Sequence, residues 1–254
     1  MFFKSCIITD IKRAFNRYEF FAAVAGVCMS LIFSLEHRGV RNGDTLFTLA
    51  MASDLTGALI AFVFCAVPFA AVFCEDLENR YVYYQLSRVN KKIYVFSKLM
   101  VIYLSSVLTM ILGTALFVGW CRIQVPWVNA GTGADEIFLS GYYGKLVEQG
   151  HYFLYCILLA MHRGFLAGIL SVAAALLSLY ISNRVMVLVL PVCVYQILVE
   201  FNMGNRFLAV SVFRTYSTRL FKYDWQCVIY LLMLSGIFVG ISGILIYRRL
   251  VNRI

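Results

Sequence analysis

The chain has 254 residues, of which 62% are hydrophobic and 14% are charged, and its net charge is +9. A typical soluble domain has about 25% charged residues, so this composition excludes an ordinary soluble protein and favours an integral membrane protein. The basic residues lie in short segments between long apolar runs, which argues against nucleic acid as a partner. We see no linker and no internal repeat, so we expect a single membrane domain over residues 1–254.

The N-terminal segment predicts an amphipathic helix over residues 1–18. Phe3, Ile7, Ile11 and Phe15 recur along one side, while lysine and arginine fall largely on the other. Helices of this kind lie in the membrane interface with their basic face toward anionic headgroups. The alternative is that the segment is only the basic flank of the first membrane span.

Six apolar runs predict an all-α fold with six transmembrane helices, since a spanning helix needs about 20 predominantly apolar residues. Pro68 is expected to kink the second helix near its inner end, and Pro191 lies in the short fifth run. GxxxG patterns at 164–168 and 236–240 indicate close helix packing. The predicted spans cover residues 20–35, 50–73, 98–120, 164–181, 185–200 and 225–247.

The distribution of lysine and arginine predicts that both termini are cytoplasmic. With the N-terminus inside, the inner segments hold thirteen of these residues and the outer segments hold eight. Cytoplasmic loops of membrane proteins are enriched in lysine and arginine. We therefore expect a multi-pass protein of the cell membrane with both ends inside.

The segment before the fourth span has two interpretations. Tyr152–Met161 is apolar but too short to cross a membrane, and His162 and Arg163 follow it. It forms either the outer part of one long helix or a broken, re-entrant element. Because an arginine in hydrocarbon costs about 2.5–3.5 kcal/mol on insertion scales, we expect Arg163 at the interface or in a wet cavity.

Motifs for nucleotide binding and for hydrolytic catalysis are absent from the sequence. The chain has no GxxxxGK[ST], HExxH or GxSxG pattern, which would bind phosphates, bind zinc or supply a serine nucleophile. We therefore expect no enzymatic activity and no cofactor in this chain. Any energy from ATP must come from another subunit.

Asp54 is the one acid that clearly falls within a predicted span, beside Ser53 and Thr56. Ionisable residues in membrane helices often mark substrate or ion pathways. Asp54 is therefore, together with Arg163, a candidate cavity or substrate contact. The alternative for Asp54 is a residue at headgroup level that caps the apolar core.

A charged loop over residues 75–97 separates the second and third spans. Its acidic residues come first and its basic residues later, as expected for a helix whose dipole favours acids near its N-terminus. The loop also contains tyrosine and arginine, which are enriched in protein interfaces. It is either a contact surface for a soluble partner or a solvated connector.

The order of the elements and several short patterns identify a family resemblance. The patterns are Phe73-Cys74-Glu75-Asp76, Leu86-Ser87-Arg88, Tyr94, Ser97-Lys98 and Pro191. Together they resemble the membrane subunits of type 2 ABC exporters, the ABC-2 permeases, and the similarity of architecture extends over the whole chain. The family often has glycine soon after the acid pair and proline beside the Ser-Arg element, whereas this chain has Asn79–Arg80 and Ser87–Arg88–Val89 at those places.

The resemblance implies that two permease chains, identical or homologous, pair in the lipid bilayer and dock separate ATPase subunits that bind ATP and Mg²⁺. Segment 75–97 would then be a coupling loop in a groove of the ATPase. Charge reversal at Glu75 and Asp76 would abolish transport without unfolding the chain. The size is similar to that of the small permeases of peptide-antibiotic resistance and of bacteriocin export or immunity. A mostly apolar cavity would suit amphipathic peptides or lipid-like molecules. The expected coupling contacts are Glu75, Asp76, Glu78, Tyr81 and Arg88.

Two other functions are compatible with the sequence. A membrane anchor or sensor would bind a cytoplasmic regulator through the same loop and transport nothing. A secondary transporter would depend on Asp54 for coupling to a proton gradient. A partner that carries a nucleotide-binding motif would favour an exporter over a sensor. An Asp54→Asn variant that kept full activity independent of a proton gradient would argue against a secondary transporter.

Overall fold

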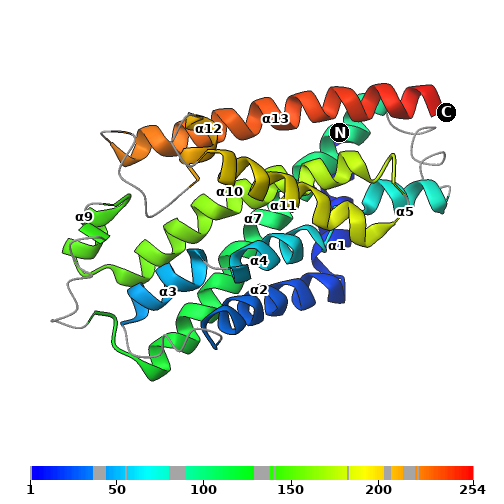
Figure 1. The fold of residues 1–254 in the computed structure, drawn as a ribbon. Coiled ribbons are helices and arrows are strands. Elements are labelled where there is room, and N and C mark those ends of the chain that lie inside the picture. Colours follow the sequence, from blue (N-terminus) through cyan, green and yellow to red (C-terminus); the bar gives the residue numbers. More distant parts are fainter. Residues whose placement is uncertain are drawn as a thin grey trace.

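The computed structural model shows an elongated bundle in which all described secondary structure is α-helical. Both chain termini lie at the same end of the bundle as helix α5, and α9 lies at the opposite end (Figure 1). We call these the α5 end and the α9 end. The structure describes residues 2–36, 44–54, 56–79, 90–128, 138–139, 141–181, 183–202, 207–213, 221 and 223–253.

Eleven helices are described. In chain order they are α1 (Phe2–Phe15), α2 (Tyr18–Glu36), α3 (Thr45–Asp54), α4 (Thr56–Ala66), α5 (Val72–Glu78), α7 (Lys91–Gln124), α9 (Gly144–Glu148), α10 (Tyr152–Leu177), α11 (Arg184–Phe201), α12 (Leu208–Ser211) and α13 (Asp224–Arg253).

Five of the described helices are long and apolar enough to cross a membrane, namely α2, α7, α10, α11 and α13. Helices α3 and α4 together form a sixth candidate, bent by 74°. The second predicted span, at 50–73, is therefore two helices in the structure. Pro68 does not kink a helix but lies in the turn after Ala66, because the residue before a proline disfavours helical geometry.

Helices α7 and α10 are both longer than the predicted third and fourth spans. α10 runs without a break from Tyr152 to Leu177, so Tyr152–Met161 belongs to one long helix and not to a re-entrant element. α7 begins at Lys91, inside the segment predicted as the coupling loop. Asn90 caps α7 there, since its side-chain oxygen accepts a hydrogen bond from the Lys92 backbone N–H at 3.1 Å.

Close packing of α7 against α10 forms the centre of the bundle. A Cβ atom added to Gly168 would lie only 2.5 Å from the ring of Tyr103, and one added to Gly164 would lie 3.2 Å from Val107, both residues of α7. The GxxxG pattern of α10 is thus a packing element, as predicted. Gly236 and Gly240 of α13 have no described atom within 4 Å of an added Cβ, so the second pattern has no such role among the described residues.

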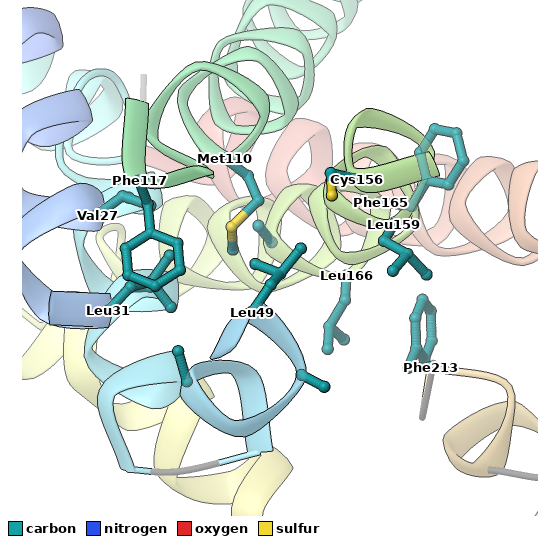
Figure 2. Packing of buried hydrophobic residues seen from close by; sticks show 14 of the residues in the cluster. Val27, Leu31, Leu49, Met110, Phe117, Cys156, Leu159, Phe165, Leu166 and Phe213 are labelled. Atoms are coloured by element: carbon teal, nitrogen blue, oxygen red, sulfur yellow. The ribbon is translucent and has the colours of Figure 1, made fainter. Parts of the chain in front are cut away.

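Helix α3 belongs to the core although it is too short to cross a membrane alone. Leu49 is buried, and in Figure 2 its side chain lies close to Met110 of α7 and Leu166 of α10. At the start of α3, the Asp44 carboxylate accepts a hydrogen bond from the Phe47 N–H at 2.7 Å. Capping and burial together hold α3 at the α9 end of the bundle.

Candidate functional site

Charged and hydroxyl side chains from α1, the link between α1 and α2, α5 and α7 meet at the α5 end of the bundle. A buried charged group is stable only when it is paired and hydrogen-bonded, so the contacts within this group determine how the three helices are held. We call it the α5 cluster. Its members are Asp10, Arg13, Arg17, Glu75, Asp76, Tyr94, Ser97 and Lys98.

Asp76 lies at the centre of the α5 cluster, and its side chain has no exposed surface. Its Oδ1 atom is 2.7 Å from Nη1 of Arg13 on α1. Its Oδ2 atom is 2.8 Å from Nζ of Lys98 on α7 and accepts a hydrogen bond from the Tyr94 hydroxyl, also at 2.8 Å. One carboxylate therefore joins α1, α5 and α7.

Lys98 is also buried, with 1% of its side chain exposed. Its Nζ atom lies 3.3 Å from Oδ1 of Asp10, and the Ser97 hydroxyl donates to Oδ2 of the same residue at 2.7 Å. The ammonium group also lies 5.0 Å from the ring centroid of Tyr94, within the range of a cation–π interaction. Two carboxylates and an aromatic ring thus compensate for its lost hydration.

Glu75 and Glu78 form the outer edge of α5. Glu75 pairs with Arg17, with 3.0 Å between Oε2 and Nη1. Glu78 is 54% exposed, and its partner Arg184, at 3.5 Å, is 55% exposed. Exposed ion pairs contribute only about 0–1 kcal/mol. The pair at Glu78 is therefore easily exchanged for contacts with another protein, whereas Asp76 holds the helices together.

The spacing of the cluster residues along each helix explains why they meet. Tyr94, Ser97 and Lys98 share one face of α7, because residues three and four apart lie side by side on a helix. Asp10 and Arg13 share a face of α1 for the same reason. The cluster thus combines the polar face of the N-terminal helix with the first turns of α7.

Charged neighbours control the ionisation of the carboxyl group at the centre. Burial acts to raise the pKa of Asp76, but the charge of Lys98 and the hydrogen bonds from Lys98, Arg13 and Tyr94 outweigh it, so the pKa lies below its ordinary value. For Arg17, burial acts to lower the pKa, but Glu75 and Glu19 leave it above the ordinary value. Both groups are therefore charged at neutral pH.

Among the predicted coupling contacts, Asp76 occupies a different environment from the one expected. We predicted a loop residue facing a partner, whereas Asp76 faces α1 and α7 and is fully buried. Glu75 is mostly buried and Glu78 is exposed. Tyr81 and Arg88 lie outside the described residues.

The two predicted cavity contacts, Asp54 and Arg163, lie on α3 and α10 respectively. Asp54 is the last residue of α3, at the bend before α4, and its side chain lies outside the described part of the chain. Arg163 is half-buried within α10, next to His162, whose side chain is fully buried and whose Nε2 atom lies 2.8 Å from the carbonyl oxygen of Val212. Arg163 thus lies within a continuous helix and not at a helix end.

A groove of about 820 Å³ runs between α4 and α11. Its walls are almost entirely apolar and include Ile60, Phe64 and Val192. Its polar residues are Gln196 and Glu200, which form a hydrogen bond of 2.9 Å along α11. This size is within the range of about 300–1,000 Å³ for small-molecule sites, and the lining suits an amphipathic molecule.

Sequence reasoning missed the internal partners of the acidic pair. Arg13 was interpreted as part of a basic face toward lipid headgroups, and Lys98 as the boundary of the third span and part of the Ser97-Lys98 pattern. A usable indication was present, since Asp10 interrupts a basic helix face and Lys98 follows an apolar helical turn. Both residues therefore needed partners of opposite charge.

A scan of protein-family models and searches of curated proteins and solved structures found no match to this chain. Within the part of the chain that the structure describes, no group of three or more His, Cys, Asp or Glu side chains is arranged to hold a metal ion.

Proposed function

We propose that this chain is the membrane-spanning subunit of an ATP-driven exporter of the ABC-2 type, working with a separate ATPase. The observation that carries the proposal is the attachment of α5 to the bundle. This short helix follows the bent α3–α4 pair, presents Glu78 to solvent, and is joined through Asp76 to both α1 and α7. A force applied to α5 would therefore move α1 and α7 with it.

In this proposal the α5 end is cytoplasmic and α1 lies in the membrane interface. The ATPase contacts the exposed edge of α5 and the segment that follows it. The groove between α4 and α11 receives the apolar part of the transported molecule, and a second permease chain completes the pathway. A conformational change of the ATPase drives transport only if its contact with α5 differs in free energy between the two states.

The partner can be identified by purifying the tagged chain from its native host in mild detergent and analysing co-purifying proteins by mass spectrometry. We expect a stoichiometric subunit that carries GxxxxGK[ST]. Its absence, even after cross-linking and with a non-hydrolysable nucleotide, would contradict the proposal. A regulator without that motif would indicate a sensor instead.

The contact can be tested with Glu78→Lys, because Glu78 is exposed and its replacement leaves the buried cluster intact. Charge reversal at Asp76, the test suggested by the sequence, would instead place a third cation beside Arg13 and Lys98 and destabilise the chain. We expect Glu78→Lys to reduce recovery of the ATPase. Lys145→Glu, an exposed substitution on α9 at the opposite end, is the matched control and should not reduce it.

A further inference from the structure

A second groove, of about 530 Å³, runs between the first turns of α7 and the last turns of α13. The two helices are antiparallel here. Lys92 and Tyr247 line the groove at the α5 end, and Leu99 lies close to Gly243 toward the bundle centre. Lys92 and Leu99 are seven positions apart on α7, a separation of about 10 Å along a helix, so the groove extends over at least this length. The groove is separate from the α5 cluster and from the α4–α11 groove.

The groove is open because α13 has glycine where a side chain would otherwise fill it. An added Cβ on Gly240 would meet no described atom within 4 Å, and one on Gly243 would lie 3.2 Å from the Leu99 side chain. In water such a groove would be solvated, but between membrane-spanning helices it faces hydrocarbon. Protein interiors and interfaces are close-packed, so apolar groups of a lipid or of another protein chain would fill this space in a membrane.

The polarity of the groove changes along its length. Its inner part is lined by apolar residues, including Val95, Leu99 and Val239, whereas Lys92 and Tyr247 stand at its α5 end. Tyrosine and lysine at a helix end are typical of the level of lipid headgroups. Lys92 is exposed, and no carboxylate of the described residues forms an ion pair with it or with Lys91.

From this arrangement we infer that the α7–α13 groove is a binding site for one acyl chain of an anionic phospholipid, whose phosphate is held by Lys92. Basic pockets between membrane helices on the cytoplasmic side bind anionic headgroups in other proteins. The apolar lining of the groove contacts the acyl chain, Lys92 selects the negatively charged headgroup, and Gly240 leaves the space that the acyl chain occupies. The inference depends on membrane insertion and not on the export function.

The site can be tested by native mass spectrometry of the full chain released from nanodiscs that contain phosphatidylglycerol and phosphatidylcholine. Gly240→Leu should displace the lipid, because Gly240 lines the groove and a Cβ atom added there meets open space that the leucine side chain would occupy. Gly236→Leu is the matched control, since Gly236 is equally open but does not line the groove. We expect the Gly240 variant, and not the control, to lose one bound lipid.

Selectivity for the headgroup is tested by Lys92→Gln. One basic residue near an anionic surface contributes about 1 kcal/mol, so retention of phosphatidylglycerol should fall about fivefold while retention of phosphatidylcholine is unchanged. Equal losses of both lipids would contradict the role assigned to Lys92. A photoactivatable phosphatidylglycerol should label the α13 residues from 239 to 247 in the wild-type chain and not in Gly240→Leu.

A second copy of this chain is the competing occupant of the groove. If α13 packs against another α13 there, Gly240→Leu will convert a dimer to a monomer and leave lipid retention unchanged. That result, or equal lipid retention by the wild type and both leucine variants, would overturn the inference. Failure to find an ATPase partner would overturn the proposed function and leave this site unaffected.

Discussion

Asp76 shows at the scale of one residue how charge holds helices together in an apolar protein. Its carboxylate contacts Arg13, Tyr94 and Lys98 at 2.7–2.8 Å and has no exposed surface. Such a group does not add stability in proportion to its Coulomb attraction, because desolvation offsets much of it. Its removal is nevertheless costly, since the cations that remain are left without their partner.

Asp76→Asn should lower the free energy of unfolding by about 3 kcal/mol, the low end of the range for breaking a buried ion pair, because Asp10 still neutralises Lys98 in part. Thermal unfolding in mild detergent measures the change. Glu78→Gln is the control on the same helix, and its effect should stay below about 1 kcal/mol because that pair is exposed. Similar losses in the two variants would contradict the central position of Asp76.

The lowered pKa of Asp76 predicts a specific pH dependence. Its folded-state pKa is below the unfolded value of about 3.9, so its contribution is fully present well above that value and is lost as pH falls through the folded-state pKa. The difference in Tm between the wild type and Asp76→Asn should be constant from about pH 8 to pH 5 and shrink below about pH 4. If this difference in Tm shrinks between pH 7 and pH 6, an ionisable group other than Asp76 must be responsible for the pH dependence.

At the scale of elements, the long helix α7 organises the bundle. Its first turns supply Tyr94 and Lys98 to the α5 cluster, and its middle packs against α2 and α10. Glycine permits this packing where the helices cross. An added Cβ on Gly113 would lie 2.5 Å from Cγ1 of Val27 and 3.1 Å from the carbonyl oxygen of Val24, both on α2.

Gly113→Ala should therefore destabilise the protein by about 1–3 kcal/mol through overpacking against α2. Gly119, on the same helix, has no described atom within 4 Å of an added Cβ. Gly119→Ala should be neutral or stabilise by up to about 1 kcal/mol, because alanine favours the helix over glycine. Thermal unfolding of both variants measures the difference, and a Gly113 variant as stable as the Gly119 variant would refute the close contact.

The long apolar runs of the sequence predicted the helical fold and five of the candidate spans, because such a run has few alternatives to a membrane helix. It did not predict the bend between α3 and α4, because both helices are rich in apolar residues and follow one another closely along the chain. It also did not predict that Asp76 faces inward. Whether a polar residue pairs internally depends on tertiary contacts. Here the contact is between Arg13 and Asp76, which are 63 positions apart in the sequence.

The whole molecule places the charged attachments of α5 at one end and the α4–α11 groove along the side of the bundle. This arrangement is suited to a subunit that is moved from one end and binds another molecule along its membrane-facing surface. Helices α11 and α13 are largely exposed, which supports the same interpretation. In the apolar stretch of each helix that could cross a membrane, only 17% of α11 and 28% of α13 is buried. Lipid, cargo or another subunit covers the remainder in a membrane.

Site-specific photocross-linking in the native membrane is the most direct test of the proposed contact between α5 and an ATPase. A photoreactive amino acid replaces Glu78 in one variant and Gln149, exposed beyond α9 at the opposite end, in the other. We predict that the probe at position 78 forms an adduct with a subunit carrying GxxxxGK[ST] and that the probe at position 149 does not. An adduct of position 78 with lipid alone, or equal adducts from both positions, would contradict the account.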